Sequence, residues 1–257
     1  MLFYLFLFSV GSFVGFLSGL LGIGGGIIMF PLLLYVPPLL GFESIDVKSI
    51  TGLTMMQGFF ASLSAMFFYK KHGLVNKSLV LSLGPALIIS SLTGALASKF
   101  VPDRALLFIF GALAMVAAAM MFIPRSYSDD HLTEDKVIFN KTTAIIIGSM
   151  LGFLIGLVGQ GGAFIIIPTL LYILKIPLRV ALGSTLAIGL FSATAGLIGK
   201  VATGQVPFPM VWPLIIGAFF SAKLGGVVGK KTKTEILRWI LALIISVTAI
   251  KVWADIF

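Results

Sequence analysis

Uncharged apolar runs long enough to cross a membrane fill most of this 257-residue chain. A helix needs about 20 consecutive apolar residues to cross the hydrocarbon core of a bilayer. The chain is 59% hydrophobic and only 11% charged, and its mean hydropathy is +1.14. These runs predict an all-α integral membrane protein and exclude a soluble fold. The apolar N-terminus lacks a positive region and a cleavage site, so we interpret it as a retained first segment.

The formal net charge of +9 would on its own be compatible with a nucleic-acid partner. The Lys and Arg residues lie in short loops between apolar runs, however, and no basic patch is interleaved with aromatic residues. We therefore expect contact with membrane lipid and not with nucleic acid. The chain has no cysteine, which excludes disulfides and thiolate metal sites. No metal site, cofactor or catalytic residue is predicted.

One stretch of the sequence occurs twice. Residues 11–35 read GSFVGFLSGLLGIGGGIIMFPLLLY and residues 148–172 read GSMLGFLIGLVGQGGAFIIIPTLLY, with 15 of 25 residues identical at an offset of 137. An offset of 131 then aligns the remainder without gaps, so the duplication covers nearly the whole chain. The predicted domains are a first membrane repeat at 1–123, a polar cytoplasmic linker at 124–141 and a second membrane repeat at 142–257.

Each copy of the stretch contains a glycine cluster within a long apolar segment, at residues 22–26 and 159–163. Glycine is a poor helix former, so we expect the helix to be interrupted there. Paired interruptions at corresponding positions of two repeats indicate the binding site of a transporter. The spacing predicts, in each half, a glycine-broken hairpin followed by three transmembrane helices.

The distribution of basic residues decides the topology. If each broken stretch enters and leaves by the same face, twelve Lys and Arg residues lie on one face and five on the other. If each stretch crosses once, the split is nine against eight; both counts leave out Lys223 as intramembrane. Only the first arrangement satisfies the positive-inside rule. It predicts inverted-topology repeats with both termini outside, and it leaves open whether the hairpin is re-entrant or crosses fully. The five outer residues are Lys48, Lys99, Arg104, Lys200 and Lys251.

The glycine clusters are the candidate substrate site. The second arm of each hairpin would present its N-terminus near mid-membrane, with free N–H groups and the positive end of its dipole. Two such N-termini facing each other would bind a small anion. The predicted binding residues of the clusters are Gly24, Gly25, Gly26, Gln160, Gly161, Gly162 and Ala163. Gln160 either binds substrate or caps a broken helix.

Polar residues elsewhere in the apolar segments complete the candidate site. They are Thr54, Gln57, Ser184, Thr185 and Lys223. Hydroxyl side chains also pack helix against helix in membranes, which is the alternative for the Ser and Thr residues. Lys223 is the one charge well inside an apolar segment, and it either contacts substrate or snorkels to the interface. No buried carboxylate is predicted to carry protons, which favours export of the anion driven by the membrane potential.

The paired motifs GLLGIGGGIIMFP and GLVGQGGAFIIIP, each followed by a polar segment with Gly-x-Thr or Gly-Ser-Thr, resemble the sulfite exporter TauE/SafE family of membrane permeases. The resemblance extends over essentially the whole chain. It implies an inner-membrane (plasma-membrane) permease that exports sulfite, sulfoacetate or a related organosulfur anion. The residues by themselves indicate only a small anion.

Three other functions are less well supported by the sequence. An intramembrane protease would need Asp in a spanning segment or a Ser and His pair, but both histidines lie in loops. A passive scaffold would not need an inverted duplication. An anion-selective channel remains the alternative, because broken helices also build selectivity filters. A homodimer is left open, although the Gly-xxx-Gly ridges are expected to pack within one chain.

Overall fold

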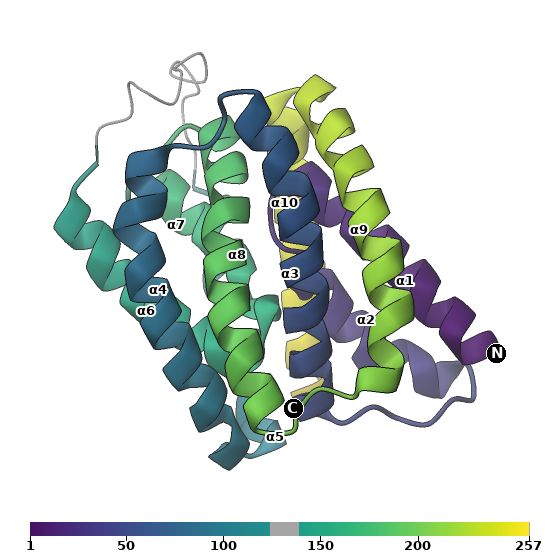
Figure 1. Cartoon of the computed structure of the whole chain (residues 1–257). Helices are drawn as coiled ribbons and strands as arrows, with labels where there is room; N and C mark the ends of the chain where they lie inside the picture. The colour runs from purple at the N-terminus through teal and green to yellow at the C-terminus, as the bar shows by residue number, and fades with distance from the viewer. Residues whose placement is uncertain (124–138, 257) are drawn as a thin grey trace.

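The computed structural model describes residues 1–123 and 139–256, and every regular element in these ranges is a helix (Figure 1). Most of the predicted linker, 124–138, lies outside the described residues. The helices are α1 Leu2–Leu21, α2 Gly26–Leu39, α3 Val47–Lys71, α4 Lys77–Ala97, η1 Ser98–Phe100, α5 Asp103–Met121, α6 Lys141–Val158, η3 Gln160–Ile165, α7 Ile166–Tyr172, α8 Leu178–Ala202, α9 Phe208–Lys231 and α10 Thr234–Ile256.

Eight helices in the described part of the chain are long and apolar enough to cross a membrane, namely α1, α3, α4, α5, α6, α8, α9 and α10. The second arms of the two predicted hairpins are shorter. The prediction of an all-helical membrane protein is therefore confirmed.

Helices α3 and α8 form the centre of the bundle (Figure 1). Their apolar windows are 67% and 72% buried, whereas those of the other spanning helices are between 39% and 50% buried. Helix α9 packs against both α1 and α3, and α4 packs against both α6 and α8. Each half therefore contributes one central helix, and these two helices contact each other.

The small-residue ridges of α1 and α6 bring helices into backbone contact. A Cβ atom at Gly15 would lie 2.5 Å from the Cα atom of Ala218 on α9. At the equivalent position in the second half, a Cβ atom at Gly152 would lie 3.0 Å from the Cα atom of Leu87 on α4. The ridges pack within the chain, as the sequence predicted. The partner residues Ala218 and Leu87 are themselves 131 positions apart.

Several helix starts follow from local sequence. Asp46 caps α3 by accepting a hydrogen bond from the Ser49 N–H at 2.8 Å. Asn76 caps α4 by accepting from the Leu79 N–H at 2.7 Å, and Asn140 caps α6 in the same way. Side-chain oxygens at these positions satisfy N–H groups that have no partner inside the helix.

Candidate functional site

The first glycine cluster interrupts the chain between α1 and α2. Helix α1 ends at Leu21, and α2 begins at Gly26 with Gly25 as its N-cap residue. Gly22 and Gly25 have φ angles of 66° and 79°, in the left-handed region that favours glycine. The glycines therefore allow the chain to reverse direction over four residues inside the bundle.

The second cluster differs from the expectation. Helix α6 ends at Val158 and Gly159 has a φ angle of 81°, but the chain then forms a 3₁₀ helix, Gln160–Ile165, before α7. A 3₁₀ helix has poorer hydrogen-bond geometry and does not build the aligned dipole of a longer α-helix. The two arms are therefore unequal, and α2 is the one that begins as an α-helix.

Each break lies against the central helix of the other half. A Cβ atom at Gly22 would lie 2.5 Å from the carbonyl oxygen of Leu182 on α8. A Cβ atom at Gly159 would lie 2.5 Å from the carbonyl oxygen of Thr51 on α3. Thr51 and Leu182 are 131 positions apart, so equivalent residues receive the two breaks.

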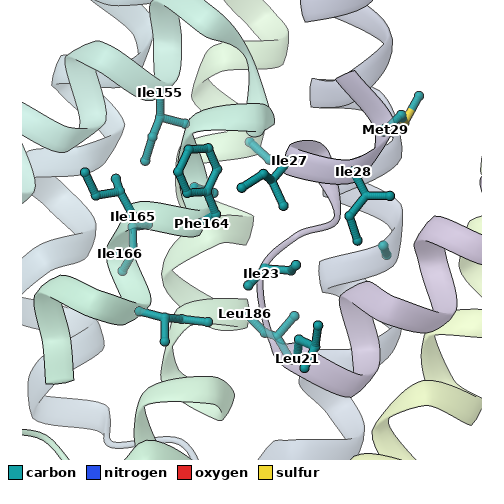
Figure 2. Packing of buried hydrophobic residues seen from close by; sticks show 14 of the residues in the cluster. Leu21, Ile23, Ile27, Ile28, Met29, Ile155, Phe164, Ile165, Ile166 and Leu186 are labelled. Atoms are coloured by element: carbon teal, nitrogen blue, oxygen red, sulfur yellow. The ribbon is translucent and has the colours of Figure 1, made fainter. Parts of the chain in front are cut away.

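The two broken segments meet inside the bundle, where α2 packs against η3. Ile23 and Ile27 from the first segment and Phe164 from the second are fully buried in one apolar cluster (Figure 2). The Phe164 ring contacts that of Phe110, which stacks on Phe30 with a centroid separation of 4.4 Å. Apolar side chains therefore fill the space where the two broken segments meet.

Gln57 on α3 is buried against the N-cap residue of α2. A Cβ atom at Gly25 would lie 3.0 Å from Nε2 and 3.2 Å from Oε1 of Gln57. The Gln57 side chain is 0% exposed, and neither amide atom has a hydrogen-bond partner. Leaving a buried polar group unpaired costs about 1–3 kcal/mol. The amide is therefore available to a ligand at the first break.

The hydroxyls at matched positions of α3 and α8 have different partners. Thr54 donates to the carbonyl oxygen of Thr51 at 2.9 Å, whereas the buried Thr185 hydroxyl has no partner. Ser184 accepts a hydrogen bond from the backbone N–H of Asn76 at 3.0 Å. Ser184 thus links α8 to the start of α4, and Thr185 is the hydroxyl left free for a ligand.

The other predicted site residues fall in two groups. Gly24, Gly26 and Ala163 are buried at the two breaks. Gln160, Gly161 and Gly162 contribute their backbone to η3, but the position of the Gln160 side chain lies outside what the structure describes. Lys223 is exposed on α9, so the structure does not bring it together with the other candidates.

Lys200 is the buried charge that sequence reasoning missed. Lys200 lies in the last turn of α8 and is 0% exposed, so the expectation that the Lys and Arg residues lie in loops is wrong for this residue. Its Nζ atom contacts Thr51 Oγ1 at 2.8 Å and Ser98 Oγ at 2.8 Å. One signal was present in the sequence. Lys200 aligns with Tyr69 at the offset of 131, so both halves carry a long polar-ended side chain there.

Two apolar grooves on the described surface lie away from these polar groups. One groove of about 520 Å³ runs between α1, α2 and α10 and is lined by apolar side chains such as Phe13, Leu32 and Leu243. Another of about 420 Å³, lined by Phe59 and Ile88 among others, lies between α3, α4 and α8. Their apolar linings suit contact with lipid chains.

The described residues hold no group of three His, Asp or Glu side chains that could bind a metal ion. Near the first break, the described side chains that are buried without a partner are the amide of Gln57 and the hydroxyls of Ser18 and Thr185. The first N–H groups of a helix such as α2 also lack the usual partner one turn earlier. Such groups bind a small polar ligand, and the N-terminus of α2 favours one with negative charge.

A bundle of spanning helices in which two broken segments meet, with a buried unpaired amide beside one break, is the architecture of a membrane transporter. The family model "Sulfite exporter TauE/SafE" matches residues 7–252, and the chain belongs to this family.

Curated relatives match over nearly their full length. The chain is 24% identical to the probable membrane transporter protein YunE of Bacillus subtilis, with 94% of each chain covered. It is 28% identical to the probable membrane transporter protein MJ0441 of Methanocaldococcus jannaschii, with 94% of this chain and 92% of the relative covered. A probable membrane transporter protein of Xylella fastidiosa is also 28% identical, with 95% and 94% covered. No solved structure matches the chain closely enough to count as a relative.

Proposed function

We propose that the protein exports a small anion, either sulfite or an organosulfur anion such as an organosulfonate, by alternating access around the two glycine breaks. The observation that carries the proposal is the Gln57 amide, which is fully buried, unpaired and in contact with the N-cap residue of α2. The first N–H groups of a helix have no partner within it and form an anion site with the dipole. Gln57 then donates to an anion that the α2 N-terminus attracts.

The proposed architecture is a pair of inverted-topology repeats. Support comes from contacts that recur at equivalent positions. Lys48 donates to the carbonyl oxygen of Lys99 at 2.9 Å, and Arg179 donates to that of Lys230 at 3.0 Å. Both pairs are related by the offset of 131. In inverted repeats, such pairs lie at opposite membrane faces, which lets one half open while the other stays closed.

We further propose an inner-membrane location with both termini outside and the segment 124–141 in the cytoplasm. The face assigned to the cytoplasm carries twelve Lys and Arg residues. The outer face carries five, whereas a single crossing by each broken stretch would give nine against eight. Only the proposed arrangement has the bias that the positive-inside rule requires.

Transport requires the packing between the two breaks to open to one side at a time. Ile23, Ile27 and Phe164 are fully buried between the breaks. Separation of α2 from η3 on one side would give an anion access to Gln57 and Thr185. A negative interior potential drives an anion outward by about 2.3 kcal/mol per charge per 100 mV. Export therefore needs no coupling ion.

Reconstitution into liposomes tests the proposal. Vesicles loaded with sulfite or sulfoacetate should release it faster than protein-free vesicles, and release should accelerate and saturate when the potential pulls anions outward. The Gln160→Ala and Gly162→Leu variants should be slower. Flux that ignores the potential argues against potential-driven export, and single-channel currents would instead support the channel alternative.

A further inference from the structure

The ammonium group of Lys200 joins the two halves of the molecule. Besides Thr51 and Ser98 of the first half, its Nζ atom contacts the carbonyl oxygen of Leu157 at 3.0 Å and Oε1 of Gln205 at 3.0 Å, both in the second half. All four partners are neutral oxygens. The group is thus solvated by the protein in place of water.

No carboxylate pairs with this charge. The one salt bridge among the described residues joins Lys251 and Asp255, at the end of α10. Burying a charged side chain is costly unless it is paired or hydrogen-bonded, and ionisable residues in spanning segments mark ion or substrate pathways. Lys200 therefore places an uncompensated positive charge inside the bundle.

The charge lies beside the second glycine break. Leu157, which accepts from Lys200, is two residues before Gly159, where α6 ends. Thr51 accepts from Lys200 through its hydroxyl, and its carbonyl oxygen is the atom against which Gly159 packs. The equivalent residue Tyr69 donates its hydroxyl to the carbonyl oxygen of Gly19 at 3.0 Å, so the first break has a neutral counterpart of this contact.

We infer that Lys200 is a specificity-determining residue of the proposed transporter, which holds the second break in place and supplies a positive charge that selects anionic substrates. The inference rests on the proposed function. Lys200 acts at a distance through its charge, since its own hydrogen bonds are already made within the protein. Its contribution must therefore scale with the charge of the ligand.

Because the effect of the charge scales with ligand charge, it can be distinguished from a purely structural effect of Lys200 by measurement. If loss of one positive charge weakens binding of a monoanion about tenfold, it should weaken binding of a dianion about a hundredfold, because the Coulomb energy doubles with ligand charge. A side chain that only held the break in place would weaken both to the same degree. Methanesulfonate and sulfoacetate supply the one and two charges.

Binding of both anions should be measured by calorimetry on the purified full-length protein. Lys200→Gln keeps a hydrogen-bond donor and removes the charge. Gln205→Glu keeps Lys200 and neutralises it with a carboxylate where Oε1 already accepts from Nζ. Ser98 and Thr203, which contact the Gln205 Nε2 atom, carry hydroxyls that can turn to donate. Lys233→Gln, which removes an exposed charge between α9 and α10, is the control and should change binding less than twofold.

The expected result is the larger loss for the dianion in both Lys200→Gln and Gln205→Glu. Equal losses for the two anions, or no loss in a variant that folds, overturn the role of Lys200 and leave the proposed function standing. If the wild-type protein binds neither anion, the proposed function fails and this inference fails with it. Should Lys200→Gln not fold, the Gln205→Glu protein alone decides.

Discussion

At the scale of single residues, the molecule buries several polar groups without partners in its described interior. The amide of Gln57 and the hydroxyls of Ser18, Ser62 and Thr185 have none. Leaving each of these groups buried without a partner costs about 1–3 kcal/mol, so these residues lower the stability of the fold. Groups that reduce stability are expected where a protein binds a ligand. Replacing these polar side chains with apolar ones should therefore raise the stability of the protein and weaken its binding of a ligand.

Replacement of Gln57 by Leu separates these two effects. Leu has a similar size and needs no hydrogen bond, so the Gln57→Leu protein should melt at a higher temperature, by the equivalent of about 1 kcal/mol. Its anion affinity should fall at least tenfold. Gln205→Leu is the matched control, because Gln205 is also buried but is fully bonded, and this variant should melt at a lower temperature. A destabilised Gln57→Leu protein would mean that the amide has a partner in the folded state.

At the scale of helices, the glycine breaks combine two constraints. Gly22 needs a left-handed backbone, and it also needs the absence of a side chain beside Leu182. Gly41, in the connection between α2 and α3, has a φ angle of 78° with no atom near its Cβ position. Both glycines therefore need a left-handed backbone, but only Gly22 also has no room for a side chain.

The Gly22→Ala and Gly41→Ala variants should differ in the same way. Gly41→Ala carries only the left-handed backbone penalty, about 1 kcal/mol. Gly22→Ala also forces α1 away from α8, and overpacking adds about 1–3 kcal/mol. Thermal unfolding followed by size-exclusion chromatography should show a small shift for the first and a large loss of folded protein for the second. Similar shifts would show that the break tolerates separation from α8.

The positions of the breaks could be predicted from sequence, because a run of glycines acts locally on the backbone. The ridge of Gly15 could be predicted for the same reason, since the spacing of small residues defines a helix face. The 3₁₀ helix after Gly159 could not, since it depends on packing against α2 and α3. The burial of Lys200 was hidden because its partners Thr51, Ser98 and Leu157 are 149, 102 and 43 residues away in the chain.

At the scale of the whole molecule, the two halves place equivalent residues in equivalent surroundings. The contacts of Gly22 with Leu182 and of Gly159 with Thr51 follow this rule. The connections α2–α3 and α8–α9 both run along the lower edge of the bundle in Figure 1. Helix α3 begins at this edge, whereas α8 ends there. The proposed inversion therefore predicts that the C-terminal ends of α3 and α8 lie on opposite sides of the membrane.

Cysteine labelling can test this directly, since the chain has no cysteine of its own. Lys71 and Ala202 are exposed, end α3 and α8, and are related by the offset of 131. In intact cells, an impermeant maleimide should label Ala202→Cys, whereas Lys71→Cys should react only after the membrane is opened. The unmodified protein is the blank. Labelling of both residues from the outside would contradict inverted repeats.

Tyr69 and Lys200 occupy equivalent positions in the two halves but differ in charge, and this difference has a kinetic consequence. A carrier with two identical halves related by inversion would present the same barrier whichever way its cargo moved. In this protein, the neutral phenol of Tyr69 lies near the first break. The ammonium group of Lys200 lies at the equivalent position near the second break. The concentrations that half-saturate inward and outward flux therefore need not be equal, and the duplicated molecule acquires a directional bias in its rates.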